Sequence, residues 1–247
     1  MSKKVKVGDV FEANGGGFVE VVSLIGSRHV EVRSLNEGGG VYKANKTSIK
    51  NSTARNPYKS TVYGVGYLGV GKHEAVENGK ITKAYSIWSG VLARCYSEEA
   101  KEVFTSYIGC IISEEWKNFQ NFAEWYKNQV GCQDDYHIDK DILVKGNKVY
   151  SAETCCLVPP EINILFKEYK NKKSGLPVGV FKHRNGRFKS VVKIDGKELF
   201  IGAYDTVEEA RKAYLSVKSV YVKLKVMKYK GKISDVAYDR IYNYVWE

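Results

Sequence analysis

Two tight-turn signals in the C-terminal third constrain the fold more than any other feature of the sequence. Residues 179–204 read "GVFKHRNGRFKSVVKIDGKELFIGAY", so Asn185-Gly186 and Asp195-Gly196 separate three runs rich in β-branched and aromatic residues. Asn-Gly and Asp-Gly tolerate the left-handed backbone of short hairpin turns. The segment therefore predicts three antiparallel strands that pair in sequence order.

A helix is predicted directly after the third strand. Thr206 stands at the position of an N-cap, and Glu209 completes a capping box three residues later. The apolar residues that follow recur at helical spacing, so they would cover one face of the sheet. These residues are Val207, Ala210, Ala213, Tyr214 and Val217.

The two faces of this sheet differ in chemistry. Strand alternation directs one set of side chains toward the helix, namely Phe188, Ser190, Val192, Ile194, Leu199 and Ile201. The opposite face combines basic and aromatic side chains, namely Phe181, His183, Arg187, Lys189, Lys193 and Phe200. Exposed phenylalanine is typical of a contact surface, whereas a half-solvated sheet with some lysines is the alternative interpretation.

The positive charge of the chain is confined to the same region. Residues 171–232 contain sixteen Lys or Arg and five Asp or Glu, whereas the rest of the 247 residues has 23 of each sign. The net charge of +11 therefore belongs to one segment. A local excess of this kind is typical of polyanion-binding modules, and we expect double-stranded DNA as the partner. A lysine-rich solvated surface remains the alternative.

The order of strand-like and helix-like segments predicts an α+β fold with several parts. The N-terminal part alternates β-rich runs with the glycine clusters "NGGG" and "EGGG", as a small barrel-like β domain would. A glycine-punctuated connector and a helical, aromatic central region follow. The predicted parts are residues 1–55 (β domain), 56–82 (connector), 83–170 (central region), 171–224 (three strands plus helix) and 225–247 (helical tail).

Apolar runs and cysteines indicate the compartment. No run approaches the length of a transmembrane helix, and the N-terminus lacks the apolar stretch of a signal peptide. We therefore expect a cytoplasmic protein with no membrane partner. The five cysteines include no C-x-x-C pair, so buried reduced thiols are favoured over a zinc site built from Cys95, Cys110 and Cys155.

A second candidate site lies at "HIDKDI", residues 137–142. On an extended strand His137, Asp139 and Asp141 would share one face, and Lys140 would lie on the other face between two isoleucines. A histidine and two carboxylates on one face could hold a divalent metal. They could equally be the solvated face of a hairpin.

The C-terminal segment resembles the DNA-binding domain of plant ethylene-response factors, the Apetala-two type. The resemblance rests on "GVFKHRNGRFKSVVKI" and "LFIGAYDTVEEARKAY", which include the family glycines Gly179, Gly186 and Gly202. In that family the outward side chains of the sheet read DNA. The corresponding residues here are Phe181, His183, Asn185, Arg187, Val191, Lys193, Glu198 and Phe200. Several arginines and tryptophans of the family are replaced, so its target sequence does not carry over.

The whole chain resembles bacteriophage HNH homing-endonuclease-like proteins, in which such a domain follows an HNH nuclease module. The segments "VYGVGYLGVG", "IWSGVLARCYSEE", "EEWKNFQNFAEWY" and "DKDILVKGNKVYSAETCCLVPPEIN" occur in the expected order. The resemblance implies a phage protein of the bacterial cytoplasm with a ββα site. Such a site cleaves DNA with a divalent metal, and Mg²⁺ is the expected ion.

Residue by residue, the HNH pattern is incomplete. The motif usually begins Asp-His, whereas this chain has Asp139-Lys140; Asn147 matches the loop asparagine. The resemblance implies Asp139 and Asn163 as metal ligands. Lys140 stands where the general base belongs, but a lysine with its ordinary pKa of about 10.4 stays protonated and would instead stabilise phosphate charge. The further candidates are His137 as a substitute base and Asp141 as an additional ligand.

These observations leave two main functional hypotheses. The first is an endonuclease that cuts double-stranded DNA with a divalent metal and reads the major groove with its C-terminal sheet. The second is a catalytically inactive DNA-binding regulator or competitor derived from such a nuclease. The hypotheses differ at Lys140. In a third, residues 1–55 form a protein-interaction module and DNA is secondary.

Overall fold

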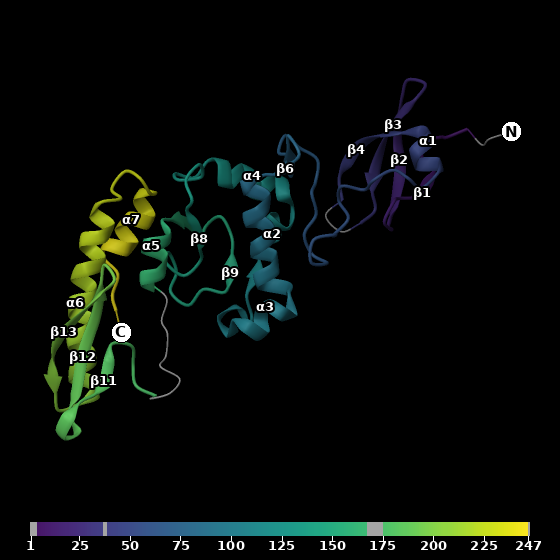
Figure 1. Ribbon diagram of the computed structural model, residues 1–247. Helices are drawn as coiled ribbons and strands as arrows, with labels where there is room; N and C mark the ends of the chain where they lie inside the picture. The colour runs from purple at the N-terminus through teal and green to yellow at the C-terminus, as the bar shows by residue number, and fades with distance from the viewer. Residues whose placement is uncertain (1–3, 37–38, 167–174, 247) are drawn as a thin grey trace. The chain divides into compact units, whose positions relative to one another are not determined.

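The computed structural model describes residues 4–36, 39–166 and 175–246. The architecture is α+β, as predicted, with several small sheets and accompanying helices (Figure 1). The chain divides into two compact units: unit 1 is residues 1–128 with 148–153, and unit 2 is residues 129–147 with 154–247. The predicted central region therefore contributes to both units. Its predicted end at residue 170 lies outside the described residues.

Unit 1 begins with a four-stranded antiparallel meander. Alternate residues of its two central strands, Val19, Val21, Val30 and Val32, are fully buried, as strands covered on one face require. Among the described strands no pairing joins the first to the fourth, so the sheet is open where the sequence predicted a barrel-like unit. The strands are β1 (Val10–Glu12), β2 (Phe18–Ile25), β3 (His29–Ser34) and β4 (Val41–Asn45), followed by the short helix α1 (Lys46–Lys50).

The rest of unit 1 is built around aromatic side chains. Trp88, Trp116, Phe119 and Phe122 are buried together, and the indole N–H of Trp88 donates to the carbonyl oxygen of Trp116 at 2.7 Å. The aromatic residues of the predicted helical central region are therefore core. The helices are α2 (Lys83–Tyr96), α3 (Glu98–Val103) and α4 (Phe119–Lys127); the paired short strands are β5 (Val76–Glu77) with β6 (Lys80–Ile81) and β7 (Ile111–Ile112) with β9 (Val149–Tyr150).

Residues 56–82 are a structured part of unit 1. The backbone N–H of Tyr67 donates to Lys117, and the N–H of Phe119 donates to Tyr67, both at 2.9 Å. The buried His73 places Nε2 2.8 Å from a carboxylate oxygen of Glu124 on α4. These contacts dock the segment, which the sequence interpreted as a connector, onto the start and middle of α4.

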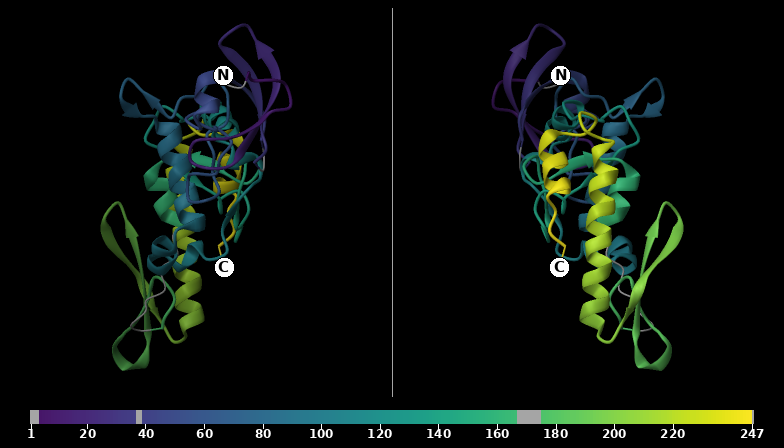
Figure 2. Two further views of the ribbon diagram at one scale, coloured as in Figure 1. Left: turned by 90° about the vertical axis from the view of Figure 1, so that its right-hand side faces the viewer. Right: turned by 90° about the vertical axis from the view of Figure 1, so that its left-hand side faces the viewer.

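Unit 2 contains the predicted arrangement of three strands and a helix. The central strand is antiparallel to both neighbours, and the sheet extends along one side of the helix (Figure 2). Asn185 and Asp195 have positive φ angles of 57° and 46°, as the two turn signals require. The capping box between Thr206 and Glu209 is formed. The elements are β11 (Val180–Lys182), β12 (Phe188–Ile194), β13 (Lys197–Tyr204) and α6 (Val207–Met227).

The second half of α6 belongs to another core. Val222 and Val226 are buried with Ile142, Val158 and Ile162 and with residues of the final helix. The expected boundary between residues 224 and 225 therefore falls inside a continuous helix. The elements that complete this core are β8 (His137–Asp139), β10 (Cys156–Val158), α5 (Pro160–Asn163) and α7 (Asp235–Tyr242).

α6 is the longest helix of the described chain, but it is not apolar, because lysines recur along it. A helix that crosses a bilayer must be both long and apolar, and none of the helices in the described ranges meets both conditions.

Gly179 offers a test of the contact between sheet and helix. Its φ is +83°, and an added Cβ would lie 2.0 Å from Cδ2 of the buried Tyr214 on α6. We expect Gly179→Ala to lower the free energy of unfolding by about 2–5 kcal/mol, because left-handed strain adds to a clash with a packed ring. Chemical denaturation followed by circular dichroism measures the loss.

Gly186→Ala is the matched control for this variant. Gly186 also has a positive φ, of +75°, but no atom lies within 4 Å of an added Cβ. We expect it to lose only the strain component, about 1–2 kcal/mol. Equal losses in the two variants would show that Tyr214 gives way to the added methyl group.

Candidate functional site

The outward face of the β11–β13 sheet is the first candidate site. Val191 pairs with Phe200 across β12 and β13, and Lys193 pairs with Glu198, so these residues share a face as expected. Phe200 is 57% exposed and Phe181 is 39% exposed. Large apolar rings are thus held in solvent on the face that also carries the basic residues.

Each of the two exposed phenylalanine rings on this face has a basic residue as a neighbour. The ammonium of Lys189 lies 5.5 Å from the ring centroid of Phe181, and the imidazole of His183 lies 6.3 Å from the ring of Phe200. Asn185 is exposed in the β11–β12 turn. Of the predicted contact residues, Phe181, His183, Lys189 and Phe200 are therefore brought into neighbouring pairs, while Lys193 extends from the far end of β12.

Arg187 is more constrained than its neighbours. Its Nε lies 2.8 Å from Oδ1 of Asp205, and its Nη2 donates to the carbonyl oxygen of Ala203 at 2.8 Å. The guanidinium is therefore anchored to the end of β13 and the start of the turn into α6. This side chain has a structural function at the sheet edge in addition to the predicted contact with DNA.

A β-bulge interrupts the simple alternation of β13. The register shifts between Ser190 and Val191, so that Ser190 pairs with Gly202 and Val191 with Phe200. Ile201 is the extra residue, which the sequence expected on the helix-facing side. The bulge keeps both Gly202 and Leu199 opposite helix-facing residues of β12, and it bends the strand locally.

The second candidate site is a ββα unit within unit 2. β8 pairs with β10 so that His137 is opposite Val158 and Asp139 is opposite Cys156; α5 follows directly. The amide Nδ2 of Asn163, the last residue of α5, lies 3.4 Å from Nδ1 of His137. His137 and Asn163, which are 26 positions apart in the sequence and were expected to act together, are thus neighbours in space.

Asp139 ends β8 and begins a turn. Its Oδ1 accepts hydrogen bonds from the backbone N–H groups of Asp141 at 2.7 Å and Ile142 at 2.8 Å. Burial raises the pKa of the Asp139 carboxyl, against the opposing effect of these two bonds. Burial therefore disfavours the charged form of this carboxyl group, an effect that a bound cation would oppose.

The strand is shorter than the sequence predicted. β8 ends at Asp139, so Asp141 lies in the turn and does not continue the face of His137 and Asp139. Its carboxylate Oδ2 instead accepts a bond from the Lys140 ammonium at 2.7 Å. The alternation fails because the carboxylate of Asp139 competes for the backbone N–H groups that a longer strand would need.

Lys140 closes the loop between β8 and β9. Its side chain is 7% exposed, and Nζ donates to Asp141 and to the carbonyl oxygen of Asn147, the latter at 2.6 Å. Asn147 in turn donates from Nδ2 to the carbonyl oxygen of Lys140 at 3.1 Å. An ammonium held between two oxygens donates protons in hydrogen bonds and accepts none. The geometry thus gives Lys140 a structural role, and its catalytic role stays a prediction.

The ββα unit offers few side chains that could hold a cation. Within the described ranges no three His, Cys, Asp or Glu side chains form a group that could hold a metal ion. Mg²⁺, however, keeps several waters and is often bound by one or two carboxylates together with substrate phosphates. Asp139 and the amide oxygen of Asn163 could supply such a partial set beside His137. Asp141 is engaged by Lys140.

The cysteines do not add a second metal site. All five lie in the described ranges and none of them forms a disulfide. Cys95 and Cys110 are buried in unit 1, and Cys155 and Cys156 are buried in unit 2. Burial raises the pKa of the Cys156 thiol far above its ordinary value, which disfavours the thiolate that a metal requires.

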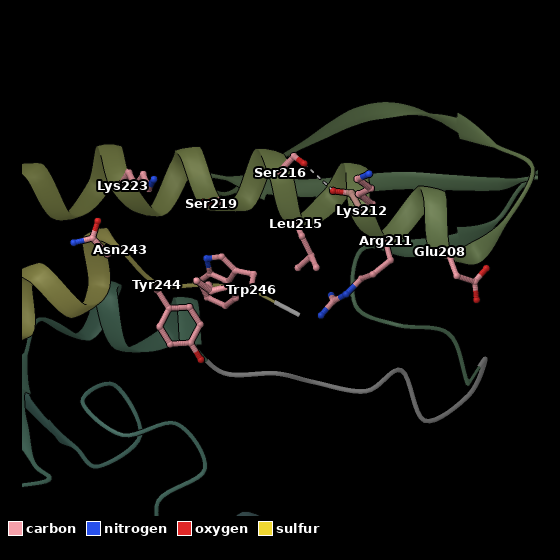
Figure 3. A pocket seen from close by; sticks show the side chains of 11 residues that line it. Glu208, Arg211, Lys212, Leu215, Ser216, Ser219, Lys223, Asn243, Tyr244 and Trp246 are labelled. Atoms are coloured by element: carbon pink, nitrogen blue, oxygen red, sulfur yellow. Dashed lines mark hydrogen bonds between the residues drawn. The ribbon is translucent and has the colours of Figure 1, made fainter.

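A hollow of about 710 Å³ lies between α6 and residues 243–246 (Figure 3). Lys223 of α6 and Trp246 are among the residues that line it. The Trp246 ring is already packed, because the Lys218 ammonium lies 3.8 Å from its centroid and the Phe166 ring stacks on it at 5.2 Å. Its aromatic surface belongs to the core of unit 2, and we assign no ligand to this hollow.

Two polar clusters have no signal in the sequence. One joins His73 and Lys72 to Glu124; the contacts with Lys72 and His73 lower the pKa of Glu124 to about 2. The other is centred on Lys225 of α6. Both link residues dozens of positions apart, so no local spacing could have revealed them.

Asp139→Asn separates the two roles of the Asp139 carboxylate. Asparagine keeps an oxygen for both backbone bonds but removes the buried charge. Because burial raises the pKa of Asp139, its ionisation destabilises the fold as pH rises through that pKa. We expect the Tm of Asp139→Asn to equal or exceed that of the wild type at pH 7, with a difference that shrinks toward pH 4. Thermal unfolding across this range measures it.

Asp139→Ala is the comparison variant. It removes both acceptor bonds, so we expect it to unfold more easily than the wild type by about 1–3 kcal/mol. If Asp139→Asn is destabilised as much as Asp139→Ala at pH 7, the negative charge itself holds the turn and the burial argument is wrong.

Comparison with known proteins adds no family to this geometry. No family model matches the sequence, and no curated protein and no solved structure matches the chain. The functional proposal therefore rests on the residues of the two candidate sites.

Proposed function

We propose that this chain binds double-stranded DNA through the outward face of the β11–β13 sheet. The observation that carries the proposal is the exposure of Phe181 and Phe200 among His183, Lys189 and Lys193 on a single face. Strands of an antiparallel sheet can enter the major groove, where Lys and Arg reach guanine edges or phosphates. Exposed phenylalanine rings can contact thymine methyl groups and sugars.

The distribution of charge supports the same partner. The segment with the excess positive charge, residues 171–232, contains this sheet and all of α6. Its charge would attract any polyanion, whereas exposed rings with basic neighbours suit a groove with both apolar and anionic surfaces. Basic charge gives affinity and the sheet face gives selectivity.

The second candidate function is metal-dependent cleavage of DNA, and the contact between His137 and Asn163 favours it. His137 is exposed and could accept a proton from the attacking water, provided that its lone pair is on Nε2. In the structure Nδ2 of Asn163 faces Nδ1 of His137, so this tautomer requires the Asn163 amide to flip and present its oxygen to Nδ1–H. Asp139 and Asn163 would hold a divalent cation, which when bound supplies charge stabilisation at the phosphate.

The contacts of Lys140 favour the rival, a nuclease-derived protein that binds DNA without cutting it. The side chain at the expected position of the general base is buried in the loop that it closes. Cleavage therefore depends on His137 alone as the base. For this reason DNA binding is the primary proposal and cleavage the secondary one.

Lys193→Ala and Phe200→Ala test the DNA interface. We expect Lys193→Ala to weaken binding to duplex DNA by about 1–3 kcal/mol if the lysine reaches a base, and Phe200→Ala to weaken binding as well. Because Phe200 is mostly exposed, its replacement should change the free energy of unfolding by no more than about 0.5 kcal/mol. Fluorescence anisotropy with a labelled random-sequence duplex measures affinity.

Lys43→Ala is the control for charge alone, because Lys43 is an exposed lysine on β4. It should leave the affinity unchanged. The logarithm of the wild-type association constant should also fall linearly with the logarithm of salt concentration. An affinity that barely depends on salt, or an equal loss in all three variants, would contradict the proposed interface.

Cleavage is tested with phage genomic DNA in the presence of Mg²⁺, Mn²⁺ or EDTA. For a working nuclease we expect discrete fragments with metal that disappear in EDTA and in the variants Asp139→Asn and His137→Ala. Asp139→Asn is informative because it is expected to stay folded. DNA that remains intact but shifts on a gel would establish the binder and exclude the secondary proposal.

A further inference from the structure

One side chain of α6 contacts two elements that carry different candidate sites. The ammonium of Lys225 lies 2.7 Å from Oδ1 of Asp195 and 2.9 Å from Oε2 of Glu161. Asp195 is in the β12–β13 turn of the sheet proposed to bind DNA. Glu161 is on α5, two residues before Asn163 of the ββα site. Lys225 thus connects both candidate sites through a single group.

Two tyrosines on either side of Lys225 complete this connection. The Tyr221 hydroxyl donates to Oδ1 of Asp195 at 3.0 Å and accepts the backbone N–H of Asp195 at 3.3 Å. The Tyr229 hydroxyl donates to Oε1 of Glu161. These three residues form the pattern Y-x-x-x-K-x-x-x-Y in the sequence. Each of the two carboxylates is therefore bound by one tyrosine and by the shared lysine. We call this set the α6 clamp: Tyr221, Lys225 and Tyr229 with their acceptors Asp195 and Glu161.

The two carboxyl groups of the α6 clamp are charged at neutral pH. The Lys225 bond and then the Tyr221 bond lower the pKa of Asp195. The Tyr229 bond and then the Lys225 bond lower the pKa of Glu161. The same bond to Glu161 raises the pKa of Tyr229 to about 12, so its hydroxyl remains a donor.

The exposure of the clamp indicates what it contributes. Lys225 is 14% exposed, but the side chains of Glu161 and Asp195 are 45% and 64% exposed. Ion pairs of this kind add little to folding free energy, because water screens them and ordering the side chains costs entropy. These ion pairs do set the relative orientation of the groups that they join. Apolar contacts along α6 are non-directional and do not set it.

We propose that Lys225 is a positioning residue that fixes the β12–β13 turn relative to α5, so that DNA held by the sheet meets the ββα site in one register. This inference rests on the proposed DNA-binding function. The geometry requires one cation with two directed bonds. Arginine can provide these bonds, whereas methionine fills similar space and provides none.

Distances between spin labels test the positioning directly and need no DNA. Labels at Lys197→Cys and Ile164→Cys, both exposed positions, report on the turn and on the end of α5. Cys132→Ser removes the cysteine that is not buried. We expect a narrow distance distribution by double electron–electron resonance in the otherwise unchanged chain. Lys225→Met should broaden it, and Lys225→Arg should restore the narrow distribution.

Two further variants keep the test decisive. Lys212→Met replaces an exposed lysine elsewhere on α6 and should leave the distribution narrow. Asp195→Asn keeps a residue that tolerates the positive φ of this turn but removes one charge of the clamp, and should broaden the distribution even if Lys225→Met fails to fold. Narrow distributions in both Lys225→Met and Asp195→Asn would overturn the positioning role.

Duplex binding by the same proteins separates this inference from the proposed function. A wild-type chain without duplex affinity refutes the DNA-binding proposal whatever the spin labels show. If the chain binds DNA but the spin-label distance distribution does not change when Lys225 is replaced, only the positioning role is refuted. We expect Lys225→Met to bind random duplex with affinity close to that of the wild type, because Lys225 contacts protein carboxylates rather than the outward face of the sheet.

Discussion

The apolar stripe of α6 is the constraint on which unit 2 depends. Ala210 and Tyr214 are buried on the part of the helix that packs against the sheet, and Val222 and Val226 are buried in the core that holds the ββα site. At 1.5 Å per residue, its 21 residues extend for about 31 Å. Because the helix is continuous, the sheet and the ββα site are attached to the same element. Any function of unit 2 that uses both the sheet and the ββα site therefore depends on α6.

Features that depend on neighbouring residues were predictable from sequence. The Asn185 and Asp195 turns and the Thr206 cap follow from side-chain chemistry within four positions, and each is formed. Burial of Ile138, which alternates with His137 and Asp139 on β8, also followed from alternation. These signals are strong because few residue types can form the capping hydrogen bond or adopt the left-handed φ angle that these positions require.

Features that depend on distant contacts were not predictable. A domain was expected to end at residue 224, but the second half of α6 is buried in a core formed by residues distant in the sequence. Lys225 and Glu161 are 64 positions apart, and the chain between them has no pattern that would bring them together. The candidate site was found in part: His137 and Asn163 do meet, but Asp141 leaves the strand because Asp139 caps the turn. Two local hydrogen bonds to the Asp139 carboxylate were enough to redirect a predicted ligand.

The turn at Asp139 also bears on the two proposed functions, DNA cleavage and DNA binding without cleavage. Asp139 holds the backbone of the turn, while Lys140 and Asn147 close the loop by reciprocal bonds, so protein groups alone define this geometry. A site with this construction does not need a metal in order to fold. Loss of catalysis would therefore leave the scaffold, the α6 clamp and the sheet intact. Exposed rings such as Phe200 add little to that scaffold, and the proposed function assigns them to contact with DNA instead.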